Sequence, residues 1–124
     1  MTPPRGRNAD APGRPARSPE DELLGLLGLA ARAGAVLTGT DTVRRGIRDG
    51  EVVHVVLAAD ASPTQQHKLV PLLEARGVPF GILLDQERLG AALGKGLVSA
   101  VGLTNRGFAG RAAELAAAIS SPQE

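Results

Sequence analysis

The chain has 124 residues, of which 43% are hydrophobic and 22% charged, with a formal net charge of +1 and no cysteine, tryptophan or tyrosine. This length fits one domain. The lack of cysteine excludes disulfides, a thiol nucleophile and cysteine-based zinc or iron–sulfur sites, and we expect neither a metal nor a cofactor. No uncharged run approaches the roughly 20 apolar residues of a membrane span, and the N-terminus lacks the apolar segment of a signal peptide. We therefore expect a cytoplasmic protein without a membrane partner.

Positive charge is concentrated at the N-terminus. Residues 1–17 hold four arginines and one aspartate, a net +3, whereas the remaining 107 residues hold 10 basic and 12 acidic side chains, a net −2. A uniformly cationic surface is therefore excluded, and binding of nucleic acid would require a local basic patch.

Residues 1–18 contain four prolines and four arginines without apolar periodicity. They bury too little apolar surface to offset the entropy of ordering, so we expect a disordered basic arm. A solubilising tail is the favoured interpretation, with contact to RNA as the alternative. Residues 19–120 are expected to form the domain and residues 121–124 a C-terminal tail.

Helical and strand patterns alternate along the domain. Ser18-Pro19 and Ser62-Pro63 each combine an N-cap residue with a first-turn proline, which predicts two helix starts. The helices are expected at residues 19–33, 40–49, 63–76, 86–93 and 105–119, and the strands at 35–37, 52–58, 78–84 and 97–103. The expected core positions on the helices are Leu23, Leu26, Leu27, Ala30, Val43, Ile47, Leu69, Leu72, Leu73, Phe108, Ala112, Leu115 and Ile119. Because the strands are almost continuously apolar, helices should cover both faces of the sheet, which gives an α/β fold built as a three-layer α/β/α sandwich.

Residues with catalytic potential do not form a recognisable site. The glycine-rich segment Gly90–Gly96 has three residues between its first two glycines, where a Walker phosphate loop has four, and no Ser or Thr follows its lysine. His54 is interpreted as a hydrogen-bonded core imidazole and His67 as a solvated one. Asp60 and Asp85 follow strands, where turn and capping roles are favoured over acid catalysis. We expect no catalytic residues, no small-molecule substrate and no enzymatic activity.

A more specific signal is the glycine turn at Gly39, which leads directly into a helix. Its unpaired N–H groups and the positive end of the helix dipole would favour a phosphate. Arg44, Arg45 and Arg48 follow within one turn of each other and could clamp phosphates or contact guanine edges. On spacing alone, an ordinary amphipathic helix with a solvated basic face is the favoured interpretation.

Six segments in order along the chain extend this signal. They are Leu26–Gly34, Gly39–Val43, Val56–Ser62, Gly77–Pro79, Leu89–Lys95 and Gly107–Ala109. Together they resemble the ribosomal L7Ae/L30e family, and in particular its small bacterial YlxQ-like branch. The resemblance implies a single-domain α/β/α sandwich that binds kink-turn RNA, a sharply bent duplex with tandem sheared G·A pairs.

The resemblance also implies which residues contact RNA. The family has a G-[ST]-N-E-hydrophobic-x-[KR] segment that enters the major groove at the G·A pairs. In this chain that segment falls on Gly39, Thr40, Asp41, Thr42, Val43, Arg44 and Arg45. Gly39 would let the RNA backbone approach, Thr40 would hold phosphate, Asp41 would accept from a guanine edge, and Arg45 would take the basic role. Asp41 and Thr42 replace the family's Asn-Glu pair, so one side chain can no longer donate and the other is shorter.

A second family contact is the loop before the last strand, which corresponds here to Gly94, Lys95, Gly96, Leu97 and Val98. Its apolar side chains would cover an extruded nucleotide, and Lys95 would meet phosphate. The sequence thus predicts an RNA-binding protein that recognises kinked, structured RNA, in a ribosomal or translation-linked setting. The alternative is a protein-interaction adaptor on the same fold, in which the arginines form rim contacts.

Overall fold

The computed structural model describes residues 18–120, so all of the expected arm except Ser18, and the C-terminal tail, lie outside the described residues. The elements are α1 (Pro19–Arg32), β1 (Val36–Thr38), α2 (Thr40–Arg48), β2 (His54–Leu57), α3 (Pro63–Arg76), β3 (Phe80–Ile82), α4 (Gln86–Leu93), β4 (Ala100–Leu103) and α5 (Arg106–Ser120). The predicted alternation of helices and strands is confirmed.

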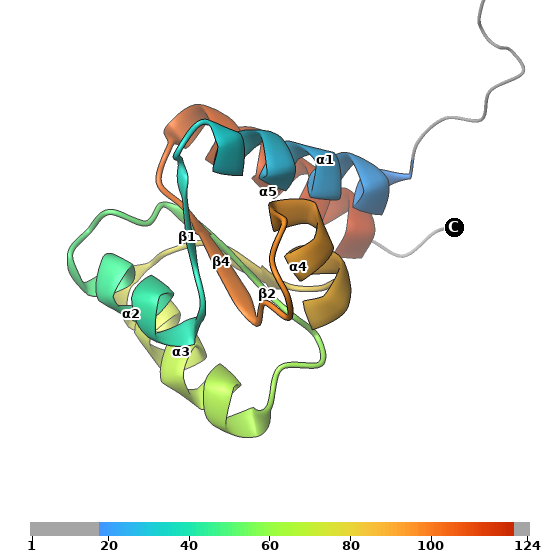
Figure 1. The fold of residues 1–124 in the computed structure, drawn as a ribbon. Coiled ribbons are helices and arrows are strands. Elements are labelled where there is room, and N and C mark those ends of the chain that lie inside the picture. Colours follow the sequence, from blue (N-terminus) through green and yellow to red (C-terminus); the bar gives the residue numbers. More distant parts are fainter. Residues whose placement is uncertain (1–17, 121–124) are drawn as a thin grey trace, which may run out of the picture.

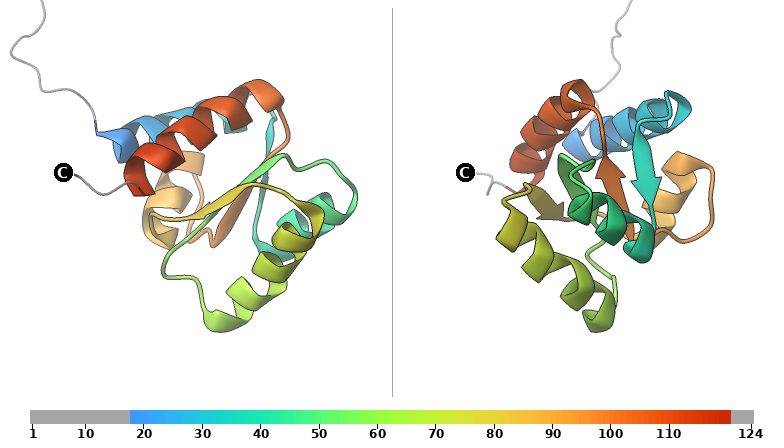
Figure 2. Two further views of the ribbon diagram at one scale, coloured as in Figure 1. Left: turned by 180° about the vertical axis from the view of Figure 1, so that it is seen from behind. Right: turned by 90° about the vertical axis from the view of Figure 1, so that its left-hand side faces the viewer.

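The four strands form one mixed sheet in the order β1-β4-β2-β3. Strand β4 is antiparallel to both β1 and β2, whereas β2 and β3 are parallel. Helices α2 and α3 cover one face of the sheet, and α1, α4 and α5 cover the other (Figures 1 and 2). This arrangement confirms the predicted three-layer sandwich.

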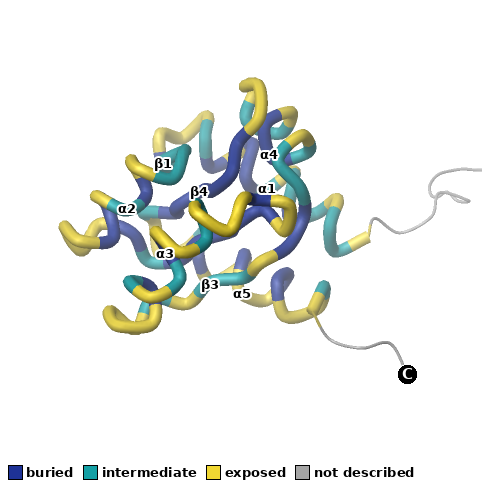
Figure 3. Tube along the Cα trace, turned by 90° about the horizontal axis from the view of Figure 1, so that it is seen from below, coloured by how far each residue is buried: buried dark blue, intermediate teal, exposed yellow. Residues whose placement is uncertain are grey.

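The core lies on both faces of the two central strands. Every residue of β2 and β4 is buried, whereas the edge strands β1 and β3 are partly exposed (Figure 3). The strands are shorter than the apolar runs predicted, because flanking residues such as Val52 and Ala58 are buried outside the regular strands. An apolar run therefore reports burial better than it reports strand length.

Helix α2 is held to the sheet by a small apolar face. Val43 and Ile47 are 0% and 1% exposed, as predicted, whereas Asp41, Arg45 and Arg48 are exposed. Each buried side chain of this size contributes roughly 1.5–3 kcal/mol to stability. On α3, Leu69 and Leu73 are fully buried but Leu72 only partly, so that prediction was only partly right.

One end of the sheet gathers the ends of three strands and the start of the fourth. Thr38 pairs with Val101, and Leu57 pairs with both Ala100 and Ile82. The starts of α2 and α3 and the segment 94–99 that leads into β4 therefore meet at this end. His54 and Leu103 pair at the opposite end.

Candidate nucleic-acid interface

The start of α2 is open. Gly39 is its N-cap residue, with φ 93° and ψ 149°, and no side chain caps the helix. The Gly39 amide donates to the Ala100 carbonyl at 2.9 Å, which fixes the helix start against β4. The amides of Thr40, Asp41 and Thr42 find no partner among residues 18–120, because the first turn of a helix has no intrahelical acceptors. Three N–H groups and the positive end of the helix dipole therefore face outward.

The other helices that the structure describes are capped by side chains. Ser18 caps α1, Asp85 caps α4, and Asn105 accepts from the Phe108 amide at the start of α5. Helix α3 has a full capping box, in which the Ser62 hydroxyl accepts from the Gln65 amide and the Gln65 side chain accepts from the Ser62 amide. Within residues 18–120, α2 alone leaves its first-turn amides without such a cap.

The basic face next to this start is only partly free. Arg45 and Arg48 are exposed, as the sequence predicted. Arg44 is partly buried, and its Nε donates to the Lys68 carbonyl of α3 at 3.3 Å. Arg76 at the end of α3 donates to the Arg48 carbonyl at 3.2 Å. These bonds tie α2 to α3 along their length, and they leave Arg45 and Arg48 as the exposed cations of the face.

Asp41 has a partner that sequence reasoning missed. The Lys68 ammonium lies 3.2 Å from the Asp41 Oδ1 atom, in an ion pair whose side chains are 47% and 80% exposed. Lys68 lies 27 residues away in the sequence. The packing of α3 beside α2 brings the two together, and the helical patterns alone did not indicate which helices are neighbours.

The segment 94–99 lies beside the start of α2. The hydroxyls of Thr40 and Ser99 form a 2.8 Å hydrogen bond, and Ser99 is buried. Gly90 of α4 packs against this segment so closely that a Cβ atom there would overlap the Gly96 carbonyl oxygen. The two segments that the resemblance pointed to are therefore adjacent in the fold.

Within the second segment, the side chains differ in exposure. Gly94, Lys95 and Gly96 are exposed, and Leu97 is 73% exposed, which is unusual for a leucine. Val98 is 5% exposed, because it turns into the core, and its amide donates to the Gln86 carbonyl. Leu97 is therefore the apolar side chain that this segment exposes, whereas the side chain of Val98 is buried.

The two histidines and the strand-end carboxylates occupy structural positions. His54 is buried, as predicted, but neither ring nitrogen finds a hydrogen-bond partner within residues 18–120, so the expectation of a hydrogen-bonded imidazole was wrong. Burial lowers the pKa of His54 below its ordinary value. Asp85 caps α4 through the Arg88 amide, and Asp60 accepts from the Gln86 amide at 2.9 Å, which confirms both capping assignments.

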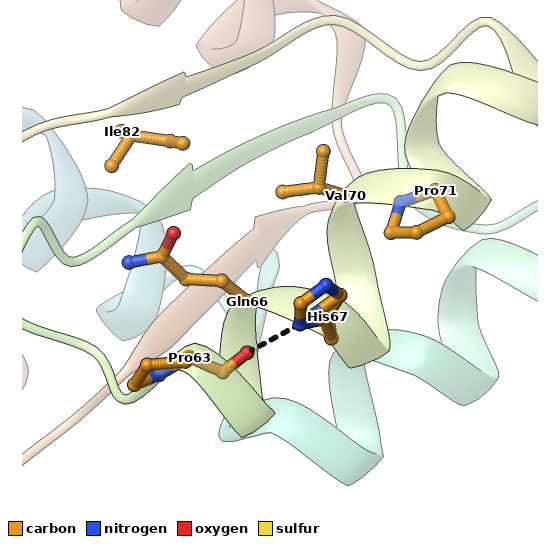
Figure 4. A pocket seen from close by; sticks show the side chains of 6 residues that line it. All are labelled: Pro63, Gln66, His67, Val70, Pro71 and Ile82. Atoms are coloured by element: carbon orange, nitrogen blue, oxygen red, sulfur yellow. Dashed lines mark hydrogen bonds between the residues drawn. The ribbon is translucent and has the colours of Figure 1, made fainter.

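A shallow groove of about 380 Å³ lies between α3 and the edge strand β3 (Figure 4). Its lining residues are Pro63, Gln66, His67, Val70, Pro71 and Ile82. His67 is exposed, as predicted, and its Nδ1 is hydrogen-bonded to the Pro63 carbonyl at 3.2 Å. No carboxylate, hydroxyl or thiol side chain lines the groove beside this imidazole, so the groove lacks the groups of a hydrolytic triad.

Two further searches cover the described residues. No group of three or more His, Asp or Glu side chains between residues 18 and 120 gathers as metal ligands would. In the same part of the chain, no helix has the length and hydropathy that crossing a membrane requires.

Comparison with known proteins identifies the family to which the chain is similar. Residues 21–112 match the ribosomal protein L7Ae/L30e/S12e/Gadd45 family. The chain is 34% identical over 90 residues to the RNA-binding protein YlxQ of Bacillus subtilis. The alignment covers 73% of this chain and 90% of that protein. It is 31% identical over 94 residues to the large ribosomal subunit protein eL8 of Thermoplasma volcanium, covering 73% and 78% of the two chains. These relatives, one an RNA-binding and the other a ribosomal protein, agree with the expectation that the chain is not an enzyme.

Two solved structures share the fold. A protein of unknown function from Bacillus halodurans is 34% identical with a TM-score of 0.73, over 76% of this chain and 95% of that one. The Giardia lamblia 15.5kD RNA binding protein has a TM-score of 0.68 over 86% and 91% of the two chains, and at 23% identity it supports the fold alone. The family match covers most of the chain and the predicted YlxQ-like resemblance is confirmed, so the chain belongs to the ribosomal protein L7Ae/L30e/S12e/Gadd45 family.

Proposed function

We propose that the protein binds RNA without catalysing a reaction, that it recognises a kinked, kink-turn-like structure, and that it works in the cytoplasm in association with the ribosome or with translation. The observation that carries the proposal is the uncapped start of α2, where three amides face outward beside the exposed Arg45 and Arg48. This start lies within the part of the chain that matches a family with RNA-binding and ribosomal members.

The interface is suited to reading RNA shape. Amides at a helix start and arginine side chains contact phosphates, and such contacts position a nucleic acid without reading its sequence. The chain has no tyrosine or tryptophan and two phenylalanines, so stacking on aromatic side chains contributes little. Asp41 supplies the acceptor for a guanine edge, and the exposed Leu97 supplies an apolar cover for an unstacked nucleotide.

The experiment is a fluorescence-anisotropy titration with a labelled kink-turn RNA. Its control is the same RNA with the sheared G·A pairs replaced by Watson–Crick pairs, and both are measured at two salt concentrations. We expect tighter binding of the kink-turn, with log affinity falling against log salt by about 0.7–0.9 for each phosphate contact.

Equal weak binding of both RNAs would contradict shape recognition. It would leave the electrostatic attraction of the arginine-rich N-terminal segment as the cause of binding and would favour the protein-interaction adaptor instead. A variant lacking residues 1–17 separates these contributions, because it keeps the whole α2 surface while removing a net charge of +3.

A further inference from the structure

The carboxylate of Asp41 poses an electrostatic problem for the proposed function, on which this inference rests. Asp41 stands in the first turn of α2, and its side chain is 80% exposed. A negative charge beside outward-facing amides competes with phosphate for the same positive field. An RNA-binding surface with an uncompensated carboxylate at its centre would repel the backbone that it has to bind.

Helix α3 supplies a compensating charge. The Lys68 ammonium lies 3.2 Å from Asp41 Oδ1. The Arg44 Nε bond to the Lys68 carbonyl fixes the backbone of Lys68 beside α2, so the pair does not depend on a single flexible contact. Asp41, Arg44 and Lys68 together form a cluster that we call the α2–α3 charge cluster, with one negative and two positive side chains.

We propose that Lys68 is a positioning residue of the RNA-binding surface, which neutralises and orients Asp41 so that the carboxylate can face RNA. Its ammonium holds Oδ1, and Oδ2 is left to accept from a guanine edge. Lys68 thereby extends the functional surface from α2 onto α3, where none of the residues predicted from the sequence to contact RNA lies.

Direct contact between Lys68 and a phosphate is a different role with a different signature. A direct contact would contribute the same affinity whether or not residue 41 is charged. A compensating residue matters only while Asp41 is charged, so its effect must disappear when Asp41 becomes neutral. Coupling between the two positions therefore distinguishes the two roles.

The test is a double-mutant cycle on the full chain with Lys68→Gln, Asp41→Asn and the double variant. The probe is the labelled kink-turn RNA at about 0.1 M salt, where exposed charges more than about 10 Å apart are largely screened. Lys68→Gln is expected to weaken binding about 5- to 10-fold, because the carboxylate of Asp41 is then uncompensated and repels a nearby phosphate. In the Asp41→Asn background the same change is expected to alter affinity by less than about twofold, since no carboxylate remains to be compensated.

Arg106→Gln is the matched control for net charge. Arg106 is exposed and follows Leu103, at the opposite end of β4 from Ser99. Removing its charge is expected to change affinity by less than about twofold, because exposed charges beyond a Debye length are screened. All variants exchange exposed polar side chains, so their melting temperatures should stay close to that of the unchanged protein, which a thermal scan verifies.

Each outcome decides one claim. An equal loss of affinity for Lys68→Gln in both backgrounds, or no loss in either, would overturn the role assigned to Lys68. One outcome is that the unchanged protein binds the kink-turn with an affinity that Arg45→Ala lowers and Lys68→Gln does not. In that case the inference about Lys68 fails and the proposed function stands. If the unchanged protein does not distinguish the kink-turn from its Watson–Crick control, the proposed function fails.

Discussion

Helices α2 and α3 begin at the same end of the sheet, yet their starts are built in opposite ways. The first turn of α3 is closed by the Ser62–Gln65 capping box and a first-turn proline. The first turn of α2 begins at Gly39, in a backbone conformation that favours glycine, and has no side-chain cap. A cap on α2 would add stability, typically about 1 kcal/mol. Its absence beside exposed arginines fits a helix start whose amides are kept for a ligand.

The largest effect is expected from Gly39→Ala. Its φ of 93° strains any residue with a Cβ, which costs about 1–3 kcal/mol of stability. Displacing the first-turn amides would also remove charge-assisted hydrogen bonds to phosphate, so we expect RNA affinity to fall about tenfold or more. Denaturant unfolding and anisotropy titration measure the two effects.

Gly34→Ala is the matched control for backbone strain. Gly34 also has a positive φ, 72°, with open space around it, but it lies before β1 at the other end of the sheet. It should lose stability while RNA affinity stays unchanged. Equal RNA affinities of the Gly39 and Gly34 variants would contradict the role of the α2 start.

A smaller effect, confined to stability, is expected from Ser62→Ala. The change removes the hydroxyl that accepts from the Gln65 amide, so the free energy of unfolding should fall by about 1 kcal/mol. RNA affinity should remain within about twofold of the unchanged protein, because the start of α2 and the arginines beside it are not altered. A loss of RNA affinity larger than the loss of folded protein would show that the contrast between the two helix starts is false.

Arg45→Ala should weaken RNA binding about 3- to 10-fold at low salt and reduce the salt slope by about 0.7–0.9, the value of one phosphate contact. Arg45 is exposed and has no hydrogen bond or ion pair within residues 18–120, so its removal costs little stability. Titrations at several salt concentrations give the slope. An unchanged slope would remove Arg45 from the interface.

The smallest effect is expected at His54, at the far end of the sheet. Burial lowers its pKa, so the folded protein keeps the neutral ring while the unfolded chain takes up a proton below its ordinary pKa of about 6.5. The free energy of unfolding should therefore fall as the pH drops from 7 to 5, and less steeply in His54→Leu. Urea unfolding at several pH values checks this, and parallel profiles for the two proteins would contradict it. RNA affinity at neutral pH should be the same for both.

Much of the fold could be predicted from local patterns. The caps at Ser18 and Ser62 placed two helix starts correctly, and the apolar runs 52–58 and 97–103, which contain β2 and β4, correctly indicated a sheet covered on both faces. The order of the strands could not be predicted, because strand neighbours are set by packing between segments distant in sequence. Without that order, the adjacency of α2 and α3 was also hidden.

In the candidate site too, local features could be predicted from the sequence, whereas contacts between distant segments could not. The glycine turn at Gly39 and the arginines after it are local features, so they were visible in the sequence. Lys68 was missed because its contact with Asp41 spans 27 residues. The sequence did not show that Leu97 is exposed and Val98 buried, because both stand in the apolar run before β4 and the turn geometry decides their exposure.

The most direct test of the central claim is the response of backbone amides to RNA. In ¹H–¹⁵N correlation spectra of the labelled protein, kink-turn RNA should shift the amides of Thr40, Asp41 and Thr42 most strongly, with Leu97 following. The amides of Ser62 and Gln65, already held by the capping box, should shift little. Large shifts at the start of α3, with the start of α2 unmoved, would contradict the account.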